Sequence, residues 1–447
     1  MPQRILLRPA FILFLSALIN LIPAASAQVP APALVGYLHN WQDGNAPYIS
    51  PDNVDARYNI VDVAFAVPEP GSDYKMQFIP DQASQPVFIS QIQTLQNAGA
   101  RVLISVGGAT APISLSNYAE RDTFIMRMTN ILNTFGFDGM DIDFEGSSLN
   151  ITGGTIAAPV DAPVINLIYA IKQIMAAYEF NHGRRMILTM APETAYVQEG
   201  MSAYGGLWGA YLPVIDALRD SIEILHVQLY NSGSMYGIDG GIYNQGTADF
   251  IVAECEAVIH GFNTAGGYFN GLPAAKVAAG LPACANAAGG GYVDSVNVRK
   301  AINYLSGTGT QPGSYVLNSS TGYPNFRGLM TWSINWDAVA SCNGAYSFAQ
   351  TFENIYGSSV AVEEVADASE SFSVFPNPTT GKFTVYGLQF TVGSVAIYRV
   401  TGEKMYEGEL NSKQSTVNCK LSPGIYFVEV RAEGVVQGRK AIVVSSE

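Results

Sequence analysis

The segment GFDGMDIDFEG, residues 136–146, carries four carboxylates within eight residues. Three of them, Asp141, Asp143 and Glu145, alternate with apolar residues, a period of two that is typical of a β-strand. Alternation places these three side chains on one face of the strand, about 7 Å apart at each step. Because unpaired buried charge is costly, such a row must be hydrogen-bonded, protonated or bound to a cation. The pattern therefore indicates a buried strand that carries chemistry.

A calcium loop is an alternative for the same segment, because DIDFEG resembles the beginning of an EF-hand loop. The spacers here are Ile142 and Phe144, however, and the twelfth position is Thr152 in place of glutamate. A carboxyl group at the upper end of the strand, kept protonated by its neighbour, can instead serve as a general acid. We therefore expect catalysis, with no metal and no cofactor.

Eight short apolar runs recur from residue 34 onward, separated by segments with apolar residues three and four apart. Nearly continuous hydrophobic strands that alternate with helices indicate a parallel sheet covered by helices. Eight such units predict an α/β fold, a closed (β/α)8 TIM barrel with its active site at the C-terminal ends of the strands. A doubly wound open sheet is the alternative, but no Gly-rich phosphate loop follows the first strand. The predicted strands are residues 34–41, 58–67, 101–108, 137–145, 186–193, 223–231, 276–284 and 327–337.

The composition is that of a large, acidic, soluble protein. The chain has 447 residues, of which 48% are hydrophobic and 13% charged, and its formal net charge is -14. A surface of this sign repels nucleic acid and anionic membranes, so neither is expected as a partner. A neutral polymer is compatible with it.

Targeting and linker segments frame the predicted barrel. Two arginines precede an apolar run that ends at a small-residue cleavage site, so residues 1–27 are interpreted as a secretory signal peptide rather than a membrane anchor. Residues 28–357 form the predicted catalytic domain, and the Ser-, Glu- and Ala-rich residues 358–370 a linker. Residues 371–447 alternate apolar and polar residues between turns, which predicts a small antiparallel β-sandwich. No membrane span is expected in the mature chain.

The four cysteines lack the paired spacing of a zinc site. Export permits disulfides, and the barrel topology makes Cys284 and Cys342 the expected pair. Free buried thiols are the alternative.

The segment DGMDIDFE resembles the DxxDxDxE signature of family 18 glycoside hydrolases, the chitinases and their relatives. The resemblance extends over residues 34–357. SVGG (105–108) is similar to the family's third-strand motif, MAPE (190–193) to the fifth, QLYN (228–231) to the sixth and MTWSINWD (330–337) to the eighth. It implies a (β/α)8 barrel that hydrolyses β-1,4 linkages between N-acetylglucosamine units, with chitin or its oligosaccharides as the partner.

The resemblance also implies roles for single residues. Glu145 resembles the general acid, and Asp143 the group that orients the substrate's own 2-acetamido group as it attacks the anomeric carbon, with net retention. Asp141 is similar to the buried partner that shares a proton with Asp143, and Tyr230 to the phenol that hydrogen-bonds the acetamide. Asn231 departs from the family pattern, because many relatives have aspartate there; the neutral amide bears on the pH optimum and not on the mechanism.

Residues expected to bind substrate lie in the same motifs and in the first strand. Exposed aromatic faces at the catalytic rim of a barrel suit stacking against pyranose rings. Trp332 matches the family's floor residue, whereas Trp208 fits a packing role in its loop equally well. The expected substrate-binding residues are Trp332, Tyr37, Met190, Gln228, Asn231, Ser105, Gly107 and Trp41.

The C-terminal residues carry a second resemblance. FSVFPNPTTGKFTV, GIYFVEV and RKAIVV resemble the C-terminal sorting domain of type IX secretion cargo, over residues 371–447. This implies export through the periplasm of a gram-negative bacterium to the cell surface or the medium, with the type IX machinery as partner. A carbohydrate-binding module is the alternative, but this region contains no Trp.

Three functions are compatible with these residues. A monomeric, secreted endo-chitinase is expected. The resemblance implies the endo mode, because family members that act from a chain end usually carry an α+β insertion that forms one wall of a deep groove, and little chain is left for it between the seventh and eighth strands. An endo-β-N-acetylglucosaminidase acting on N-glycan cores would use the same residues. A noncatalytic chitin-binding barrel is disfavoured, because such relatives typically lack the terminal glutamate, which is present here as Glu145.

Overall fold

The structure, a computed structural model, describes residues 29–357, 372–386, 393–399, 403–432 and 435–445. The signal peptide and the linker predicted from the sequence lie outside these ranges. The chain divides into two units after Gly357.

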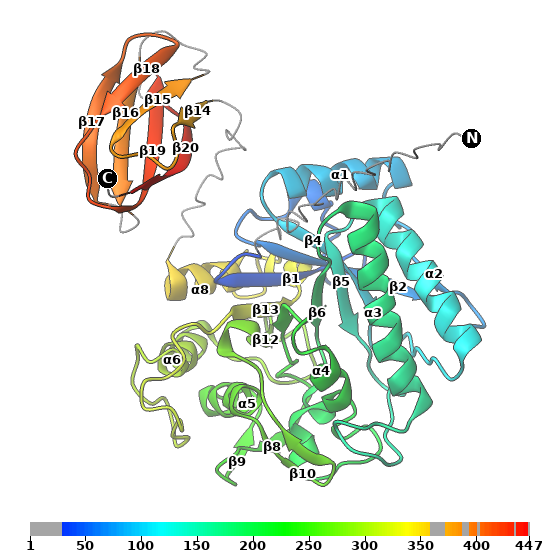
Figure 1. The fold of residues 1–447 in the computed structure, drawn as a ribbon. Helices are drawn as coiled ribbons and strands as arrows, with labels where there is room; N and C mark the ends of the chain where they lie inside the picture. The colour runs from blue at the N-terminus through cyan, green and yellow to red at the C-terminus, as the bar shows by residue number, and fades with distance from the viewer. Residues whose placement is uncertain (1–28, 358–371, 387–392, 400–402, 433–434, 446–447) are drawn as a thin grey trace, which may run out of the picture. The chain divides into compact units, whose positions relative to one another are not determined.

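A ring of parallel strands organises residues 29–357 (Figure 1). Neighbouring strands pair in chain order, and the last, β13, lies between β12 and β1. The two-residue strand β7 meets β12 through the bridges Leu225 to Val277 and Gln228 to Gly280, which close the ring. The predicted (β/α)8 barrel is therefore confirmed. Its strands are β1 (Ala33–His39), β2 (Ile60–Pro68), β4 (Arg101–Gly107), β5 (Gly139–Asp143), β6 (Ile187–Met190), β7 (Ile224–Leu225), β12 (Ala278–Pro282) and β13 (Gly328–Trp332).

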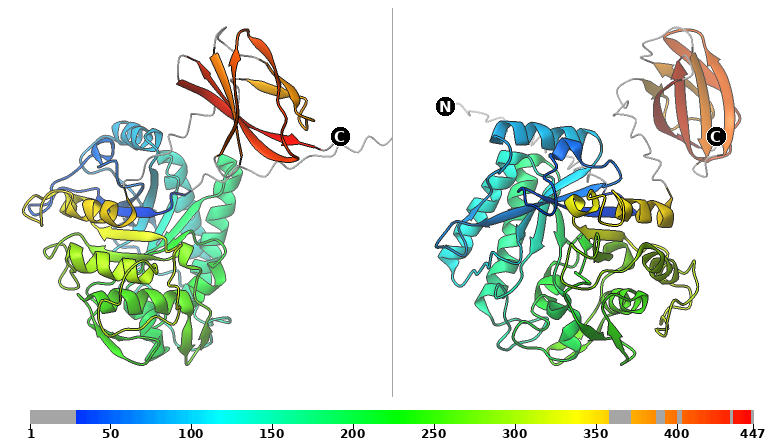
Figure 2. Two further views of the ribbon diagram at one scale, coloured as in Figure 1. Left: turned by 90° about the vertical axis from the view of Figure 1, so that its left-hand side faces the viewer. Right: turned by 180° about the vertical axis from the view of Figure 1, so that it is seen from behind.

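Helices cover the outside of the ring (Figures 1 and 2). Helix α2, which leads into β5, begins at Asn117, whose side chain accepts hydrogen bonds from two backbone N–H groups of the first turn. It ends at Gly136, whose φ of 72° is the left-handed conformation that favours glycine. The helices are α1 (Gln85–Asn97), α2 (Tyr118–Phe135), α3 (Ala162–His182), α4 (Leu212–Leu218), α5 (Ala248–His260), α6 (Ser295–Leu305), α7 (Ile334–Asp337) and α8 (Ser347–Tyr356).

Alternation along the strands separates two apolar cores. On β5, Met140 and Ile142 are fully buried in the layer between strands and helices. Inside the ring, a smaller cluster includes Ile60, Leu103 and Met330. Burial of each such aliphatic side chain contributes roughly 1.5–3 kcal/mol. The two cores fix the register, so the row of carboxylates on β5 must point inward.

Short β-strand pairs lie in the connections between the barrel strands. Strands β8 (Ser234–Tyr236) and β9 (Ile242–Asn244) pair in the loop that follows β7, and β10 (Phe262–Thr264) pairs with β11 (Gly267–Phe269) before β12. The two-residue strand β3 (Met76–Gln77) pairs with the end of β2. Between β12 and β13, the described residues 283–327 contain helix α6 and no strand.

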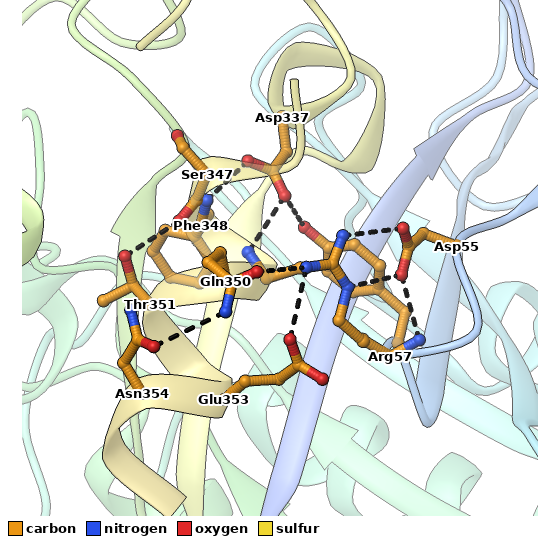
Figure 3. Close-up of polar contacts among 11 residues, drawn as sticks. Asp55, Arg57, Asp337, Ser347, Phe348, Gln350, Thr351, Glu353 and Asn354 are labelled. Carbon is orange, nitrogen blue, oxygen red and sulfur yellow. Dashed lines mark hydrogen bonds and ion pairs between the residues drawn. The ribbon is translucent and has the colours of Figure 1, made fainter. Parts of the chain in front are cut away.

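Asp337, the last residue of the eighth-strand motif, stabilises the C-terminal end of the barrel unit through hydrogen bonds (Figure 3). Its carboxylate accepts hydrogen bonds from the hydroxyl of Tyr58 at 2.7 Å and from the backbone N–H of Phe348 at 2.7 Å. Beside Tyr58, Arg57 lies 3.5 Å from Glu353 of α8. This motif residue therefore holds α8 against the chain that enters β2.

The structure pairs Cys284 with Cys342, the pair expected from the sequence. The bond joins the loop after β12 to the loop after α7. Cys255 and Cys419 are buried thiols.

The second unit consists of two antiparallel sheets around one core. Phe383, Val395 and Val428, from both sheets, are among its buried residues. Within the described parts of the whole chain, we find no helix with both the length and the apolar character needed to cross a bilayer. One sheet has the order β14 (Ser373–Phe375), β15 (Lys382–Tyr386), β18 (Gln414–Asn418), and the other β17 (Lys404–Leu410), β16 (Gly393–Arg399), β19 (Gly424–Ala432), β20 (Val435–Val444).

Candidate active site

A cavity of ≈ 500 Å³ opens at the C-terminal ends of the barrel strands. Parallel strands bring their C-terminal ends to one rim, so residues from motifs far apart in the sequence meet there. The sequence-predicted residues that line the cavity are Tyr37, Trp41, Gly107, Asp143, Glu145, Gln228, Tyr230, Asn231 and Trp332.

Two carboxyl groups share one amide at this site. The Nε2 atom of Gln228 donates to Asp143 Oδ1 at 2.9 Å and to Glu145 Oε1 at 3.0 Å. Gln228 follows β7 and is itself fixed, since the same nitrogen lies 2.9 Å from the backbone oxygen of Ala191. The amide therefore sets the orientation of both carboxyl groups at once.

Burial changes the acidity of this pair. Burial, followed by the negative charge of Glu145, raises the pKa of Asp143 well above its usual range. Burial also raises the pKa of Glu145, an effect that hydrogen bonds from Gln228 and with Asp143 partly offset. Two coupled carboxyl groups in one buried site retain a proton between them at a pH where isolated carboxyl groups are ionised. The pKa of Asp143 is raised more strongly than that of Glu145, which favours Asp143 as the group that holds this proton.

Asp141 lies below the pair, entirely buried in the barrel interior. Its Oδ2 atom accepts hydrogen bonds from the hydroxyls of Tyr37 at 2.6 Å and Ser105 at 2.7 Å, and its Oδ1 atom accepts one from Thr189 at 2.7 Å. Three hydroxyl donors are an environment suited to a carboxylate anion.

The expected sharing of a proton between Asp141 and Asp143 stays a prediction. Among the described residues, no hydrogen bond joins the two carboxyl groups. The hydroxyls of β1, β4 and β6 hold Asp141, while Gln228 turns Asp143 toward Glu145. The two acids therefore belong to separate hydrogen-bonded groups in this state of the protein.

The sixth-strand motif places a phenol and an amide at the rim. Tyr230 is 6% exposed and lines the cavity, and burial raises the pKa of its hydroxyl well above the ordinary value, so it remains a donor. Asn231 has a φ of 54°, and its backbone N–H donates to Gly290 at 3.1 Å. This turn carries the Asn231 side chain to the cavity.

Gly107 is required by a close approach of two strands. Its φ is 120°, and a Cβ atom at this position would lie 2.2 Å from the backbone oxygen of Asp143. Any side chain here would push β4 away from β5 at the level of the carboxyl pair. Gly107 therefore contributes to the cavity as a backbone surface.

Aromatic rings form one side of the cavity. The rings of Trp332 and Phe65 are stacked with centroids 5.9 Å apart, and Trp41 and Phe65 with centroids 6.2 Å apart. His39 stacks on Trp41 at 4.5 Å, and burial lowers its pKa to about 4, so the imidazole is neutral at neutral pH. The result is an apolar platform beside two acids, an arrangement suited to a sugar ring.

Three expectations for single residues need correction or qualification. Met190, expected to contact substrate, is fully buried in the outer core, because alternation on β6 points Thr189 inward and Met190 outward. Ser105 is also fully buried and acts on Asp141, not at the cavity surface. Trp208 is 45% exposed and does not line this cavity.

Asp138, the fourth carboxylate of the opening segment, lies before β5 and outside the cavity. It pairs with Arg184 at 2.8 Å and accepts a hydrogen bond from the backbone N–H of Val102 at 2.9 Å. It is a structural residue at the start of the strand.

Sequence reasoning missed part of the lining. Thr189, which holds Asp141, sits in an unremarkable apolar strand and carries no signal by itself. Alternation would also have missed Phe65, because it shares the parity of Val61 and Val63, which face the outer core. An irregularity of β2 between Val63 and Ala66 brings Phe65 to the inner cluster. The further lining residues are Asn40, Phe65, Val67, Ala109, Thr110 and Ala287.

The chain resembles known proteins over both of its units. A chitinase of Paenibacillus xylanexedens is 45% identical over 313 residues, which are 69% of this chain and 59% of that protein. Chitinase D of Niallia circulans is 43% identical over 337 residues, 73% of this chain and 63% of that protein. The chain thus spans about three fifths of the length of these curated relatives.

Solved structures and family matches agree with this. The crystal structure of a family GH18 chitinase from Chromobacterium violaceum superposes with a TM-score of 0.64 at 36% identity, covering 76% of this chain and 90% of that one. Residues 373–444 match the secretion system C-terminal sorting domain. Residues 33–358 match glycosyl hydrolases family 18, and the chain therefore belongs to that family.

Proposed function

We propose that this protein is a secreted chitinase that cleaves β-1,4 linkages between N-acetylglucosamine units within the polymer, with retention of anomeric configuration. One observation carries the proposal: Asp143 and Glu145 share the amide of Gln228 at the base of a cavity walled by aromatic rings. The relatives named chitinases support chitin as the substrate.

Glu145 is the general acid. It stands at the cavity surface beyond the end of β5, where it can reach a glycosidic oxygen, and burial keeps its pKa raised. The proton on Asp143 in the free protein moves to Glu145 when a hydrogen-bond donor of the substrate faces Asp143. A substrate acetamide N–H is such a donor, because it stabilises the Asp143 anion.

The substrate supplies the nucleophile. The carbonyl oxygen of its 2-acetamido group attacks the anomeric carbon as the glycosidic bond breaks, so no carboxylate of the enzyme forms a covalent bond. Asp143 then balances the positive charge of the oxazolinium ring, and the buried hydroxyl of Tyr230 holds the acetamide in place. Water opens the ring from the opposite side, and Glu145 takes its proton. Two inversions give net retention.

The path of the chain supports cleavage within the polymer. Because residues 283–327 contain helix α6 and no strand, they build no additional α+β wall beside the cavity. Sugar units distant from Trp332 are then held weakly, so the enzyme releases its substrate after one cut. An endo-acting, poorly processive enzyme is the consequence.

The C-terminal unit accounts for export. A sorting domain of this kind implies secretion or surface export in bacteria. We further propose passage through the periplasm followed by the type IX machinery, so that deletion of residues 371–447 retains the enzyme in the periplasm.

Hydrolysis of chitin oligosaccharides, followed by NMR at early times, tests the proposal. The β-anomer of the product is expected first, and the Glu145→Gln variant serves as the control. A dominant α-anomer would contradict substrate-assisted retention. Release of N-glycans from a glycoprotein without hydrolysis of chitin would instead assign the endo-β-N-acetylglucosaminidase activity.

Attack within the polymer has a separate test. Soluble chitin derivatives are expected to lose viscosity early, before many reducing ends appear. Slow loss of viscosity with dimer as the dominant early product would show an exo-acting cleft.

A further inference from the structure

A second buried acid lies behind the catalytic row. Asp62, on β2, and His226, directly after β7, are both fully buried inside the barrel. The Nε2 atom of His226 lies 3.6 Å from Asp62 Oδ2 and 3.5 Å from Asp141 Oδ1. Within the described residues, these three side chains are the one group of acids and histidines close enough together to hold an ion.

The two acids of this junction have very different partners. Asp141 accepts three hydroxyl hydrogen bonds, which stabilise its negative charge. Neither oxygen of Asp62 receives a hydrogen bond from any described residue. In a low-dielectric interior, an ionised carboxylate without donors is strongly disfavoured relative to a protonated one.

The surroundings offer no other counter-charge. The titratable groups that face Asp62 are Tyr37 of β1, Asp141 of β5 and His226, and Ile60 and Leu103 of the inner core lie below them. No described lysine or arginine forms an ion pair with Asp62 or Asp141. A single imidazole nitrogen faces both acids, so one N–H cannot satisfy two carboxylates. One further proton is needed.

We propose that Asp62 is a neutral, protonated acid that, with His226, forms a buried positioning pair behind Asp141, so that the only negative charge beneath the catalytic carboxyl groups is that of Asp141.

The acidities of the group agree with this assignment. Burial, followed by the charge of Asp141, raises the pKa of Asp62 well above its usual range. Burial lowers the pKa of His226, against the opposing effect of Asp141, so a neutral imidazole is favoured over an imidazolium ion. Neutral Asp62 and neutral His226 leave one anion in the junction, where it meets three hydroxyl donors.

The consequence for catalysis rests on the proposed function. If Asp62 were ionised, a second negative charge behind Asp141 would raise the proton affinity of Asp143 further. The row's proton would then stay on Asp143 and would not reach Glu145. Two events should therefore lower kcat/KM at high pH: loss of the Asp62 proton and ionisation of Glu145 itself.

Infrared difference spectroscopy on the full-length protein tests the proton directly. The protein is labelled with ¹³C at the aspartate carboxyl groups and measured at pH 6, and the spectrum of Asp62→Asn is subtracted from that of wild type. We expect one protonated-carboxyl band to be lost and no carboxylate band. Loss of a carboxylate band would overturn the proposal, as would one equivalent of metal that disappears in Asp62→Asn. This readout does not depend on any enzymatic activity.

A second variant covers failure of Asp62→Asn to fold. His226→Gln keeps Asp62 and retains a polar group near the position of Nε2. The protonated-carboxyl band should persist and move in frequency, because its neighbour has changed. Superimposable bands in His226→Gln and wild type would show that the proton lies elsewhere, and the proposal would fall.

The pH profile separates a positioning role from a structural one. In Asp62→Asn the basic limb of kcat/KM should move to higher pH by about half a unit, roughly threefold in proton affinity. A residue that acts only through stability would scale the whole profile without moving the limb. If the infrared result is as expected but the basic limb does not move, then Asp62 is protonated without any effect on catalysis. The positioning role would then be wrong.

Discussion

The hydroxyl of Tyr37, in the first barrel strand, donates to Asp141 in the fourth across the barrel interior at 2.6 Å. The two residues are separated by 104 positions in the sequence, and only closure of the ring brings them together. Burial, followed by the charge of Asp141, raises the pKa of the Tyr37 hydroxyl well above its ordinary value, so it remains a donor at neutral pH. The contact fixes the lowest carboxylate of the catalytic row.

Tyr37→Phe should lower both stability and turnover. It leaves a buried oxygen of Asp141 with one donor fewer, at a cost of about 1–3 kcal/mol in the free energy of unfolding. The matched control is Tyr178→Phe, which removes a 3.0 Å hydrogen bond to the backbone oxygen of Phe137 before β5. Both variants should lose similar stability in thermal unfolding, but only Tyr37→Phe should lose kcat. Equal kcat in the two variants would show that Tyr37 is purely structural.

Glu145→Gln should abolish turnover, because the amide keeps the shape of the side chain but cannot act as an acid. The expected loss in kcat is about 10²–10⁴-fold, with oligosaccharide binding and thermal unfolding close to wild type. Glu179→Gln, which removes an exposed carboxylate on α3, is the control for the change in net charge. A Glu145→Gln rate above about a tenth of wild type would contradict the assignment.

Gln228→Met should shift the basic limb of the activity profile. The amide of Gln228 donates to Glu145 and so lowers the pKa of that group, against the larger effect of burial. Without this donor the pKa rises, the acid form persists to higher pH, and the basic limb of kcat/KM moves up. Gln198→Met is the control, because Gln198 is buried but bonds to the backbone oxygen of Glu254 outside the cavity. A limb that moves down would contradict the prediction.

Glu254 offers a test of stability against pH. It is fully buried in α5 without a hydrogen bond to its carboxyl oxygens from the described residues, and burial raises its pKa well above the ordinary value. A raised folded-state pKa contributes stability fully below the unfolded pKa of about 4.3, and this is lost as pH rises toward the folded value. Glu254→Gln should therefore gain in Tm over wild type as pH rises from 5 to 8.

Glu256, two residues along the same helix, is the matched control. Its carboxylate accepts hydrogen bonds from the hydroxyls of Tyr315 at 2.6 Å and Tyr323 at 2.7 Å. Glu256→Gln should be destabilised at every pH by about 1–3 kcal/mol. The same response to pH in both variants would contradict the prediction, because both groups are buried and only Glu256 accepts hydrogen bonds.

The barrel unit should be catalytically self-sufficient. Every residue that lines the cavity precedes Gly357, where the chain divides into two units. A chain of residues 28–357 is expected to hydrolyse soluble oligosaccharides at the full-length rate, measured as reducing ends. A loss confined to insoluble chitin would show instead that the second unit binds the polymer.

The sequence predicts the barrel well because the period of the apolar residues and the length of each apolar run are local features of the chain. Six of the eight predicted strands contain the observed ones, whereas β1 and β2 each extend one residue beyond the predicted range, to Ala33 and Pro68. Alternation in DIDFE correctly places Asp141 and Asp143 inside the ring. The observed strands are shorter, most of all β7, because parallel pairing ends where the loops begin to diverge. Apolar composition by itself does not mark that point.

The site is harder to predict, because it depends on which neighbour each group meets. Resemblance gave Asp141 a proton-sharing role with Asp143, but Thr189 and Gln228 decide the partners of both acids. The same reasoning that drew attention to the acidic row could have found Asp62, which is a lone carboxylate inside the apolar run YNIVDVAFAV. The prediction for Met190 is wrong because a family motif names residues but does not show which face of the strand each of them occupies.

The bond between Cys284 and Cys342 makes the stability of the folded protein depend on the redox conditions of its compartment. It closes a loop of 58 residues between the last two strand ends, which in the chain-entropy account stabilises the fold by about 4 kcal/mol. Under reducing conditions the same chain carries two thiols, and the loops after β12 and α7, near Trp332, lose their covalent tie. Preparations made in a reducing cytosol should therefore differ from oxidised ones in heat tolerance while sharing an identical sequence.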